Sequence, residues 1–204
     1  VFVAHMDEVG FEITAIREDG TAAVRGRGGM YLSLYEAHPM YVPLENRFVP
    51  AVMTPRRDYA AAKTSQPEIE ALSLYFGTST AAETRALGVT EGQPATIRKK
   101  LDLLGPDRAS GRSMDDRAGS TALLLALKQI DPKTVKNRVT FAWVVEEEIG
   151  LNGAAFLASR MKPDHAFAVD TFVSTDAPLD VQRLAHAELG KGAVLRGMDS
   201  RTVT

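Results

Sequence analysis

The sequence predicts an α/β protein, a mostly parallel β-sheet covered by helices, with a small β-rich domain inserted after the first strand. Three short runs carry this prediction, because each is apolar on both faces and ends at ionisable residues. They are Val1 to Ala4, Val139 to Val145 and Ala166 to Val169. Ligands of such sheets bind just beyond the carboxyl ends of the strands. The ionisable residues therefore fall where a functional site is expected.

Two segments between these runs have the pattern of helices. Asp116 to Ile130 begins at a cap-like aspartate and ends before a proline, which cannot continue the helical hydrogen-bond ladder. Gly153 to Met161 fills the interval before the last run. This alternation of strand and helix predicts that residues 1–10 and 107–204 belong to one α/β domain.

The segment between these two parts, residues 11–106, is predicted to be the β-rich domain because turn signals and alternating strands dominate it. Its prolines and charges in the middle are typical of loops. The expected elements are a hairpin formed by Phe11 to Arg17 and Thr21 to Gly26, a strand from Glu70 to Phe76, a short helix that opens at the capping-box residues Thr80 to Glu83, and loops from Met40 to Pro67.

The composition limits the function. The chain has 204 residues, with 24 basic against 26 acidic side chains, so it offers no electrostatic reason to bind nucleic acid or an anionic membrane. No apolar stretch approaches the roughly 18 residues of a membrane span. There are no cysteines, which fits a cytoplasmic protein and leaves histidine and carboxylate as the ligands for any metal. A small molecule or a peptide remains the default substrate.

His5 and Asp115-Asp116 are the first candidates for chemistry. His5 ends the first run, and Asp7 lies close enough for its carboxylate to fix the imidazole tautomer, leaving the other ring nitrogen free for a metal. A structural histidine is the alternative interpretation. Asp115-Asp116 stands directly before a helix, where an N-cap role competes with a ligand role. Two adjacent acids leave room for both.

Glu146-Glu147-Glu148 is the most informative local feature. Three carboxylates at the end of a buried strand are costly unless a cation lies nearby, although a solvated strand end is the alternative. Asp170 ends the third run in the same way. Imidazole and carboxylate ligands suit zinc, manganese or cobalt, and a carboxylate beside a ligand can act as general base. The combination predicts hydrolase chemistry.

Four motifs follow one another along the chain: Val3-Ala4-His5-Met6-Asp7-Glu8-Val9-Gly10, Asp115-Asp116-Arg117-Ala118-Gly119, Glu147-Glu148-Ile149-Gly150-Leu151-Asn152-Gly153-Ala154 and Asp170-Thr171-Phe172-Val173-Ser174. In this order they resemble the motifs of the M42 family of metalloaminopeptidases, which includes the tetrahedral TET peptidases and glutamyl aminopeptidases. The resemblance continues to Leu189-Gly190-Lys191-Gly192 and implies a zinc-peptidase-like fold.

The resemblance also implies the roles of individual residues. Two divalent ions, zinc or cobalt with manganese as a further candidate, are expected, and Glu147 is implied as general base with Asp7 orienting His5. The Asp115-Asp116 peptide bond is expected to be cis. The implied metal ligands are His5 and Asp170 for one ion, Asp115 bridging both, and Glu148 for the second.

Removal of N-terminal residues from peptides is the implied activity, and the inserted domain corresponds to the family's dimerisation domain, so a homo-oligomer is expected. Family members extend beyond both ends of this chain, and the histidine that completes the second metal site is expected past Thr204. His38, His165 and His186 lie outside that motif, and His186 is expected at the surface. This chain alone is therefore expected to hold at most one metal firmly and to show little activity. A related two-metal deacylase or carboxypeptidase, or a noncatalytic assembly module, is the alternative.

Overall fold

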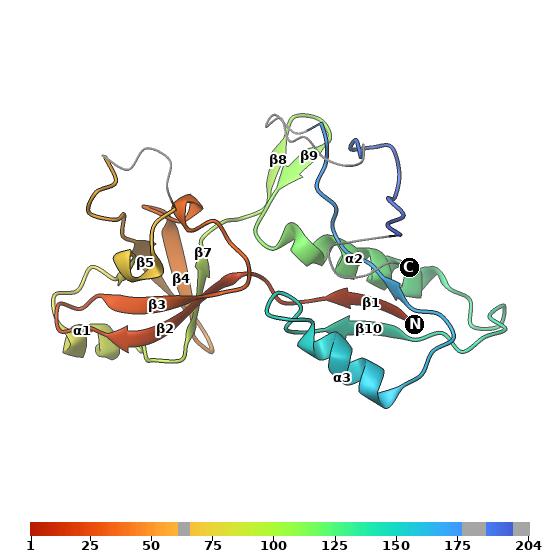
Figure 1. Cartoon of the computed structure of the whole chain (residues 1–204), viewed down its shortest axis with the longest axis horizontal. Helices are drawn as coiled ribbons and strands as arrows, with labels where there is room; N and C mark the ends of the chain where they lie inside the picture. Colours follow the sequence, from red (N-terminus) through yellow and green to blue (C-terminus); the bar gives the residue numbers. More distant parts are fainter. Residues whose placement is uncertain (61–65, 177–186, 198–204) are drawn as a thin grey trace.

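A computed structural model describes residues 1–60, 66–176 and 187–197 of the chain. The predicted α/β class is confirmed, and the structure has two parts, a small sheet with helices and a closed β-barrel (Figure 1). His186, expected at the surface, lies outside the described residues. Among the described residues, we find no helix with the length and hydropathy that crossing a bilayer requires.

A three-stranded parallel sheet forms the first part. Strand β1 (Phe2–His5) lies between β10 (Phe141–Val144) and β11 (Phe167–Ala168), and both pairings are parallel. The rings of Phe2, Phe141 and Phe167 stack across the three strands, with centroids 5.5 and 5.0 Å apart. The three predicted runs thus become neighbouring strands, so their carboxyl ends meet at one edge.

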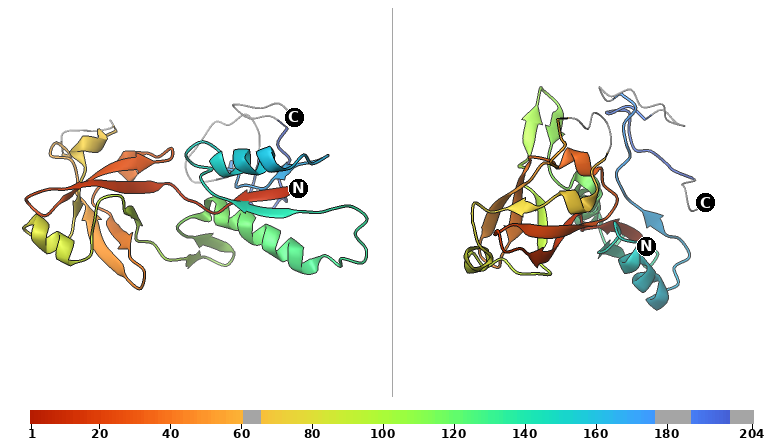
Figure 2. Two further views of the ribbon diagram at one scale, coloured as in Figure 1. Left: turned by 90° about the horizontal axis from the view of Figure 1, so that it is seen from below. Right: turned by 60° about the vertical axis from the view of Figure 1, so that its left-hand side comes forward.

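Helices α2 (Met114–Gln129) and α3 (Asn152–Arg160) lie on opposite sides of this sheet (Figures 1 and 2). Both helices occur where the sequence predicts them. Gly119 in α2 is required by a close approach, because a Cβ atom there would lie 2.3 Å from Oδ1 of Asp116. The first turn of α2 is thereby packed tightly around that carboxylate.

Six strands close the barrel in the order β2-β3-β6-β5-β4-β7. The predicted hairpin is confirmed, with a register shift between Ile13 and Ala15. Phe11, Ile13, Met40 and Leu74 are among the fully buried residues that fill the interior. The strands are β2 (Gly10–Ile16), β3 (Ala22–Arg27), β4 (Pro39–Pro43), β5 (Phe48–Met53), β6 (Leu74–Tyr75) and β7 (Pro94–Ile97).

The prediction of loops from Met40 to Pro67 is wrong for its first part, because β4 and β5 occupy most of the segment up to Met53, whereas residues 54–60 form neither strand nor helix. Proline lacks an N–H donor and is tolerated only where the ladder does not need one. Pro39 and Pro43 lie at the two ends of β4, and Pro50 lies in the part of β5 that extends beyond its short neighbour β6. The prolines therefore do not prevent strand formation.

The predicted strand from Glu70 to Phe76 is too long. Its first part is the 3-10 helix η2 (Ile69–Ala71), and only β6 is paired as a strand. Leu72, which lies between these two elements, is fully buried. The short helix α1 (Ala81–Ala86) is confirmed, with Oγ1 of Thr80 accepting the N–H of Glu83 at 3.2 Å. A second 3-10 helix, η1 (Leu32–Leu34), precedes β4.

A separate hairpin joins the barrel to α2. It consists of β8 (Asp102–Leu104) and β9 (Arg108–Ser110), and it projects beside the later part of the chain (Figure 1). The loop after β9 runs directly into the first turn of α2. This loop therefore leads directly to Asp115, a predicted site residue in the first turn of α2.

Candidate metal centre

His5 is the centre of a group of acidic side chains at the carboxyl edge of the sheet. It is the last residue of β1 and is 3% exposed. Its Nε2 lies 3.0 Å from Oδ1 of Asp115, and 3.9 Å from both Oε2 of Glu147 and Oδ1 of Asp170. Residues predicted from three distant parts of the sequence therefore meet at one imidazole.

Three of these side chains offer one ligand atom each within a space suited to a single ion. The ligand atoms of His5, Asp115 and Asp170 all lie within 4.8 Å of one another. His5 is buried, whereas both aspartates are exposed. In the described part of the chain, no other group of three or more such side chains has this geometry.

Asp115 and Asp116 are neighbours in sequence but contact different groups. The peptide bond that joins them is cis, and both residues have non-helical backbone angles at the start of α2. Asp115 faces His5, whereas Asp116 is fully buried and its Oδ1 accepts the N–H of Gly119 at 2.9 Å. Asp116 thus has the capping contact that the sequence allowed, and Asp115 is left free to face the site.

Glu148 is not part of the group of ligand atoms around His5. It lies where the barrel meets the sheet, because a Cβ atom on Gly28 would be 3.2 Å from the Cβ of Glu148 and 2.7 Å from Cγ1 of Val9. Gly28 has a positive φ of 90° at the end of β3. Only glycine fits both this backbone conformation and this space, so the barrel approaches the acidic segment closely here.

Asp7 contacts both His5 and the acidic segment. Its main-chain oxygen lies 3.1 Å from Nδ1 of His5, and its Oδ1 lies 3.4 Å from the same nitrogen. Its carboxylate also accepts the main-chain N–H groups of Glu147 at 3.1 Å and Glu148 at 3.2 Å. Asp7 therefore reaches the imidazole through two oxygens and at the same time holds the loop after β10.

Burial and crowding of negative charge raise the pKa values of several acidic side chains at the site. Burial raises the pKa of Glu148 to about 7, and the charges of Asp115 and Glu147 act in the same direction. Burial also raises the pKa of Asp116 to about 6. The pKa values of Glu147 and Asp170 are raised by burial and by neighbouring carboxylates. Without a cation, these groups are therefore protonated more readily than ordinary carboxylates.

Burial and the acidic neighbours shift the pKa of the His5 imidazole in opposite directions. Burial alone lowers the pKa of His5, but the hydrogen bond with Asp115 and the charges of Glu147 and Asp170 outweigh it, so the pKa is raised overall. Nearby negative charge favours a positive charge at this position. A bound cation would be favoured for the same reason.

Sequence reasoning missed Ser120 as a support of the site. Its hydroxyl donates to the main-chain oxygen of His5 at 2.8 Å, and its own main-chain oxygen accepts the indole N–H of Trp143 at 3.2 Å. These bonds tie α2 to β1 and β10. A serine inside a predicted helix carries no local signal of such a contact, so only the fold reveals it.

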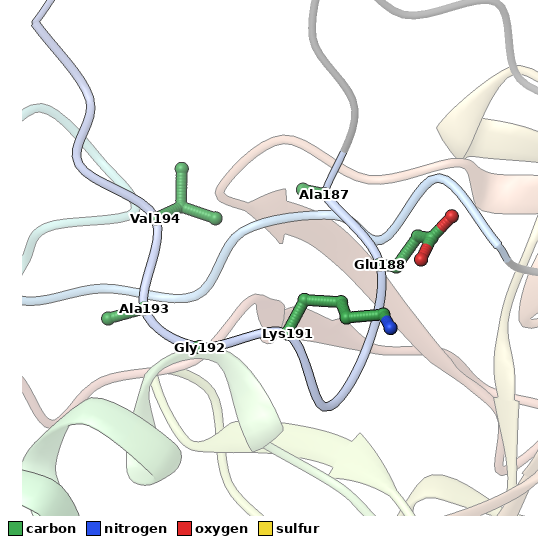
Figure 3. Close-up of a pocket in the computed structure, with 6 residues that line it drawn as sticks. All are labelled: Ala187, Glu188, Lys191, Gly192, Ala193 and Val194. Carbon is green, nitrogen blue, oxygen red and sulfur yellow. The ribbon is translucent and has the colours of Figure 1, made fainter.

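A hollow elsewhere on the chain contains none of the predicted site residues. It measures about 340 Å³ and is formed by one loop around Lys191, whose side chain runs along it (Figure 3). Its lining residues are Ala187, Glu188, Lys191, Gly192, Ala193 and Val194.

The fold and the acidic centre define the class of an α/β protein with a closed β-barrel and a candidate metal centre at the edge of its sheet. The family profile described as M42 glutamyl aminopeptidase matches residues 1–204, and the chain belongs to that family. Among curated relatives, it is 30% identical over 176 residues to a putative aminopeptidase of Acetivibrio thermocellus, covering 86% of this chain and 50% of that protein. It is 28% identical to the glutamyl aminopeptidase of Lactococcus lactis, covering 96% and 56%.

Solved structures agree with this membership. An aminopeptidase from Desulfurococcus kamchatkensis has a TM-score of 0.82 and 29% identity, over 94% of this chain and 52% of that one. The Pyrococcus horikoshii TET1 peptidase, described as assembling into a tetrahedron or a large octahedral shell, has a TM-score of 0.75 and 32% identity, over 84% and 52%. The chain spans about half the length of the curated relatives it matches.

Proposed function

We propose that the protein is a metal-dependent aminopeptidase that hydrolyses N-terminal residues from peptides. The observation that carries the proposal is the group formed by His5, Asp115 and Asp170, with Glu147 at 3.9 Å from the same imidazole nitrogen. Membership of the M42 glutamyl aminopeptidase family supports the activity. A cytoplasmic location is part of the proposal and is supported by the absence of cysteine.

The donor set fits divalent cations. One imidazole and two carboxylates within 4.8 Å match the nitrogen and oxygen ligands that zinc, cobalt and manganese accept. Burial raises the pKa values of Asp170 and Glu148, and neighbouring carboxylates act in the same direction, so a cation among these side chains would be favoured. In our assignment His5, Asp170 and Asp115 would hold one ion, and Asp115 and Glu148 would hold the second.

Two bound ions would supply Lewis-acid polarisation of the scissile carbonyl and activation of a water. The Glu147 carboxylate would accept a proton from the attacking water and pass it to the leaving amine, first as a general base and then as a general acid. Burial raises the pKa of Glu147, which brings it closer to neutral pH and improves its ability to exchange protons. Asp7 keeps Glu147 in place through the main chain.

We further propose that the partners are peptide substrates and other copies of the same chain, and that residues 11–106 form the inserted domain through which copies associate. The outward face of the barrel supports this assignment, since Phe48 is 57%, Val52 41% and Tyr75 46% exposed. Phe48 and Val52 alternate with buried residues along β5, and Val52 is the cross-strand partner of Tyr75, so these side chains form an apolar row on the outer face of the barrel. Nothing in the charge balance of the chain favours nucleic acid or a membrane as partner.

The proposal is tested with the complete gene product by titrating metal and assaying hydrolysis. We expect tight binding of Co²⁺ or Zn²⁺ and cleavage of a peptide with a free N-terminal amine, but not of the same peptide after N-acetylation. The 204-residue chain should bind one equivalent firmly, because His5, Asp115 and Asp170 form one group and Glu148 lies outside it. Cleavage of the acetylated peptide alone would favour a deacylase, and absence of both metal and turnover would overturn the proposal.

A further inference from the structure

Glu8 is a carboxylate beside the centre whose two oxygens are both engaged. Its Oε1 accepts the hydroxyl of Thr96 at 3.3 Å. Its Oε2 accepts the hydroxyl of Ser113 and lies 3.1 Å from Nε of Arg112. The side chain of Glu8 is 22% exposed and that of Arg112 23%, so both are largely buried. We call Glu8, Thr96, Arg112 and Ser113 the Glu8 clamp.

The Glu8 clamp joins three segments that otherwise lie far apart in the sequence. Glu8 follows His5 at the exit of β1, and Thr96 belongs to β7 of the barrel. Arg112 and Ser113 form the loop that enters α2, two residues before Asp115. One carboxylate therefore connects the strand end that presents His5 to the loop that presents Asp115.

The loop needs such an external support. Ser113 has a left-handed backbone conformation with φ of 57°, and its side chain makes no capping bond to α2. Such a conformation is unfavourable for a residue other than glycine unless its surroundings hold it. The hydroxyl of Ser113 is used instead for Glu8, and Arg112 balances the charge of that carboxylate.

Both oxygens of Glu8 contact protein groups, and Glu8 is not among the ligand atoms grouped around His5. We propose that Glu8 is a positioning residue that fixes Asp115 relative to His5 through Ser113 and Arg112, and links this geometry to the barrel through Thr96. The inference rests on the proposed function where it concerns metal binding. Its effect on the loop is independent of that function.

The test compares Glu8→Ala with the matched control Glu12→Ala in the complete gene product. Glu12 is also a carboxylate paired with arginines, Arg25 and Arg27, but it lies on β2 of the barrel. Without metal, we expect amide hydrogen exchange across 112–116 to rise by about tenfold or more in Glu8→Ala, because the loop opens locally. Glu12→Ala should leave that segment unchanged.

Metal binding is the second readout. Loss of Glu8 should weaken Co²⁺ binding by about 10- to 100-fold, the usual effect of removing a group that orients a ligand, and should alter the visible absorption of bound Co²⁺. Turnover should fall mainly in kcat. In a double-mutant cycle with Ser113→Ala, the combined loss should be smaller than the sum of the single losses, because both variants break one contact.

Each outcome decides the proposal. Unchanged loop exchange in Glu8→Ala overturns it whether or not the protein binds metal. Wild-type protein that binds no Co²⁺ would refute the proposed function, and loop exchange alone would then decide the role of Glu8. If Glu8→Ala does not fold, Glu8→Gln replaces it, because the amide keeps one acceptor oxygen but loses the charge facing Arg112. In that variant, increased exchange supports the proposal and wild-type exchange overturns it.

Discussion

Oδ1 of Asp7 accepts the main-chain N–H of Glu147 at 3.1 Å, a bond between residues 140 positions apart. The other oxygen accepts the N–H of Glu148 at 3.2 Å. Both N–H groups belong to the loop between β10 and α3, so a side chain at the end of β1 determines where this loop lies. The carboxylates of Glu147 and Glu148 are placed by their backbone, and the backbone is placed by Asp7.

This relationship predicts the effect of Asp7→Asn. An amide has one acceptor oxygen, so one of the two N–H groups loses its bond, at a cost of about 1–3 kcal/mol. We expect a lower melting temperature and a kcat/KM reduced by about tenfold or more, because Glu147 is displaced. Asp19→Asn is the control, since Asp19 also accepts two hydrogen bonds, from the N–H and hydroxyl of Thr21, but in an exposed turn. Equal effects of the two variants would contradict this account.

Glu147→Gln separates catalysis from metal binding. The amide cannot accept the proton, so we predict turnover lower by at least about 100-fold, the usual scale for a general base, with metal affinity nearly unchanged. Glu146→Gln is the matched control, because Glu146 is the exposed neighbour whose carboxylate bonds to Asn152. Metal content measured on both variants distinguishes the roles. Loss of metal together with activity in Glu147→Gln would make it a ligand.

The acidic centre predicts an unusual pH dependence of stability. Glu148 has a pKa of about 7 against an ordinary 4.5, and Asp116 about 6 against 3.8. Between these values the folded protein binds more protons than the unfolded chain, so the free energy of unfolding falls as pH rises. In EDTA, we therefore expect the melting temperature to decrease as the pH rises from about 4 to about 7.

Thermal unfolding of two variants checks the source of this slope. Glu148→Gln should flatten it, because the titrating group is gone. Glu91→Gln should not, since the pKa of Glu91 is lowered to about 2 by its hydrogen bonds with Arg85 and it stays ionised throughout. Added Zn²⁺ should reverse the slope, because cations compete with protons for the same oxygens. A slope unchanged in Glu148→Gln would disprove the assignment.

The convergence of His5, Glu147 and Asp170 could be predicted from sequence because it depends on a simple rule. Buried parallel strands align their carboxyl ends, and each predicted strand ends in an ionisable residue. The short helix at Thr80 and the first hairpin could also be predicted, since capping boxes and tight turns are local signals. Local patterns sufficed wherever the structure depends on neighbours in sequence.

Contacts between distant segments could not be predicted in this way. Closure of the barrel depends on pairing β7 with both β2 and β4, and the prolines of β4 and β5 locally favour loops. The bonds from Glu8 to Thr96 and Ser113 likewise require the fold before they can be recognised. The metal-ligand roles, the number of ions and the domain boundaries stay predictions, which the experiments above address.

The buried pair Glu36 and Arg56 predicts a strong effect on barrel stability. Their side chains are 1% and 8% exposed, Nε of Arg56 lies 3.3 Å from Oε1 of Glu36, and the N–H of Arg56 donates to Oε2 at 3.0 Å. Removing one partner leaves a buried charge, so Arg56→Met should cost about 3–5 kcal/mol in denaturant unfolding. Its exposed neighbour provides the control, and Arg57→Met should change stability by less than about 0.5 kcal/mol. An effect of Arg56→Met as small as that of Arg57→Met would refute the prediction.

The apolar row on the barrel predicts where copies of the chain associate. Phe48 is 57% exposed, its ring lies 5.0 Å from that of Tyr41, and Val52 pairs with Tyr75 on the next strand. Burying a phenylalanine contributes about 1.5–3 kcal/mol, so Phe48→Glu should weaken association by about tenfold or more. Sedimentation velocity of the complete gene product at micromolar concentration measures this. Thr14→Glu introduces the same charge at an exposed position of β2 and should leave the oligomer intact. A monomeric wild type would refute association, whereas an oligomer that tolerates Phe48→Glu would place the interface on another face.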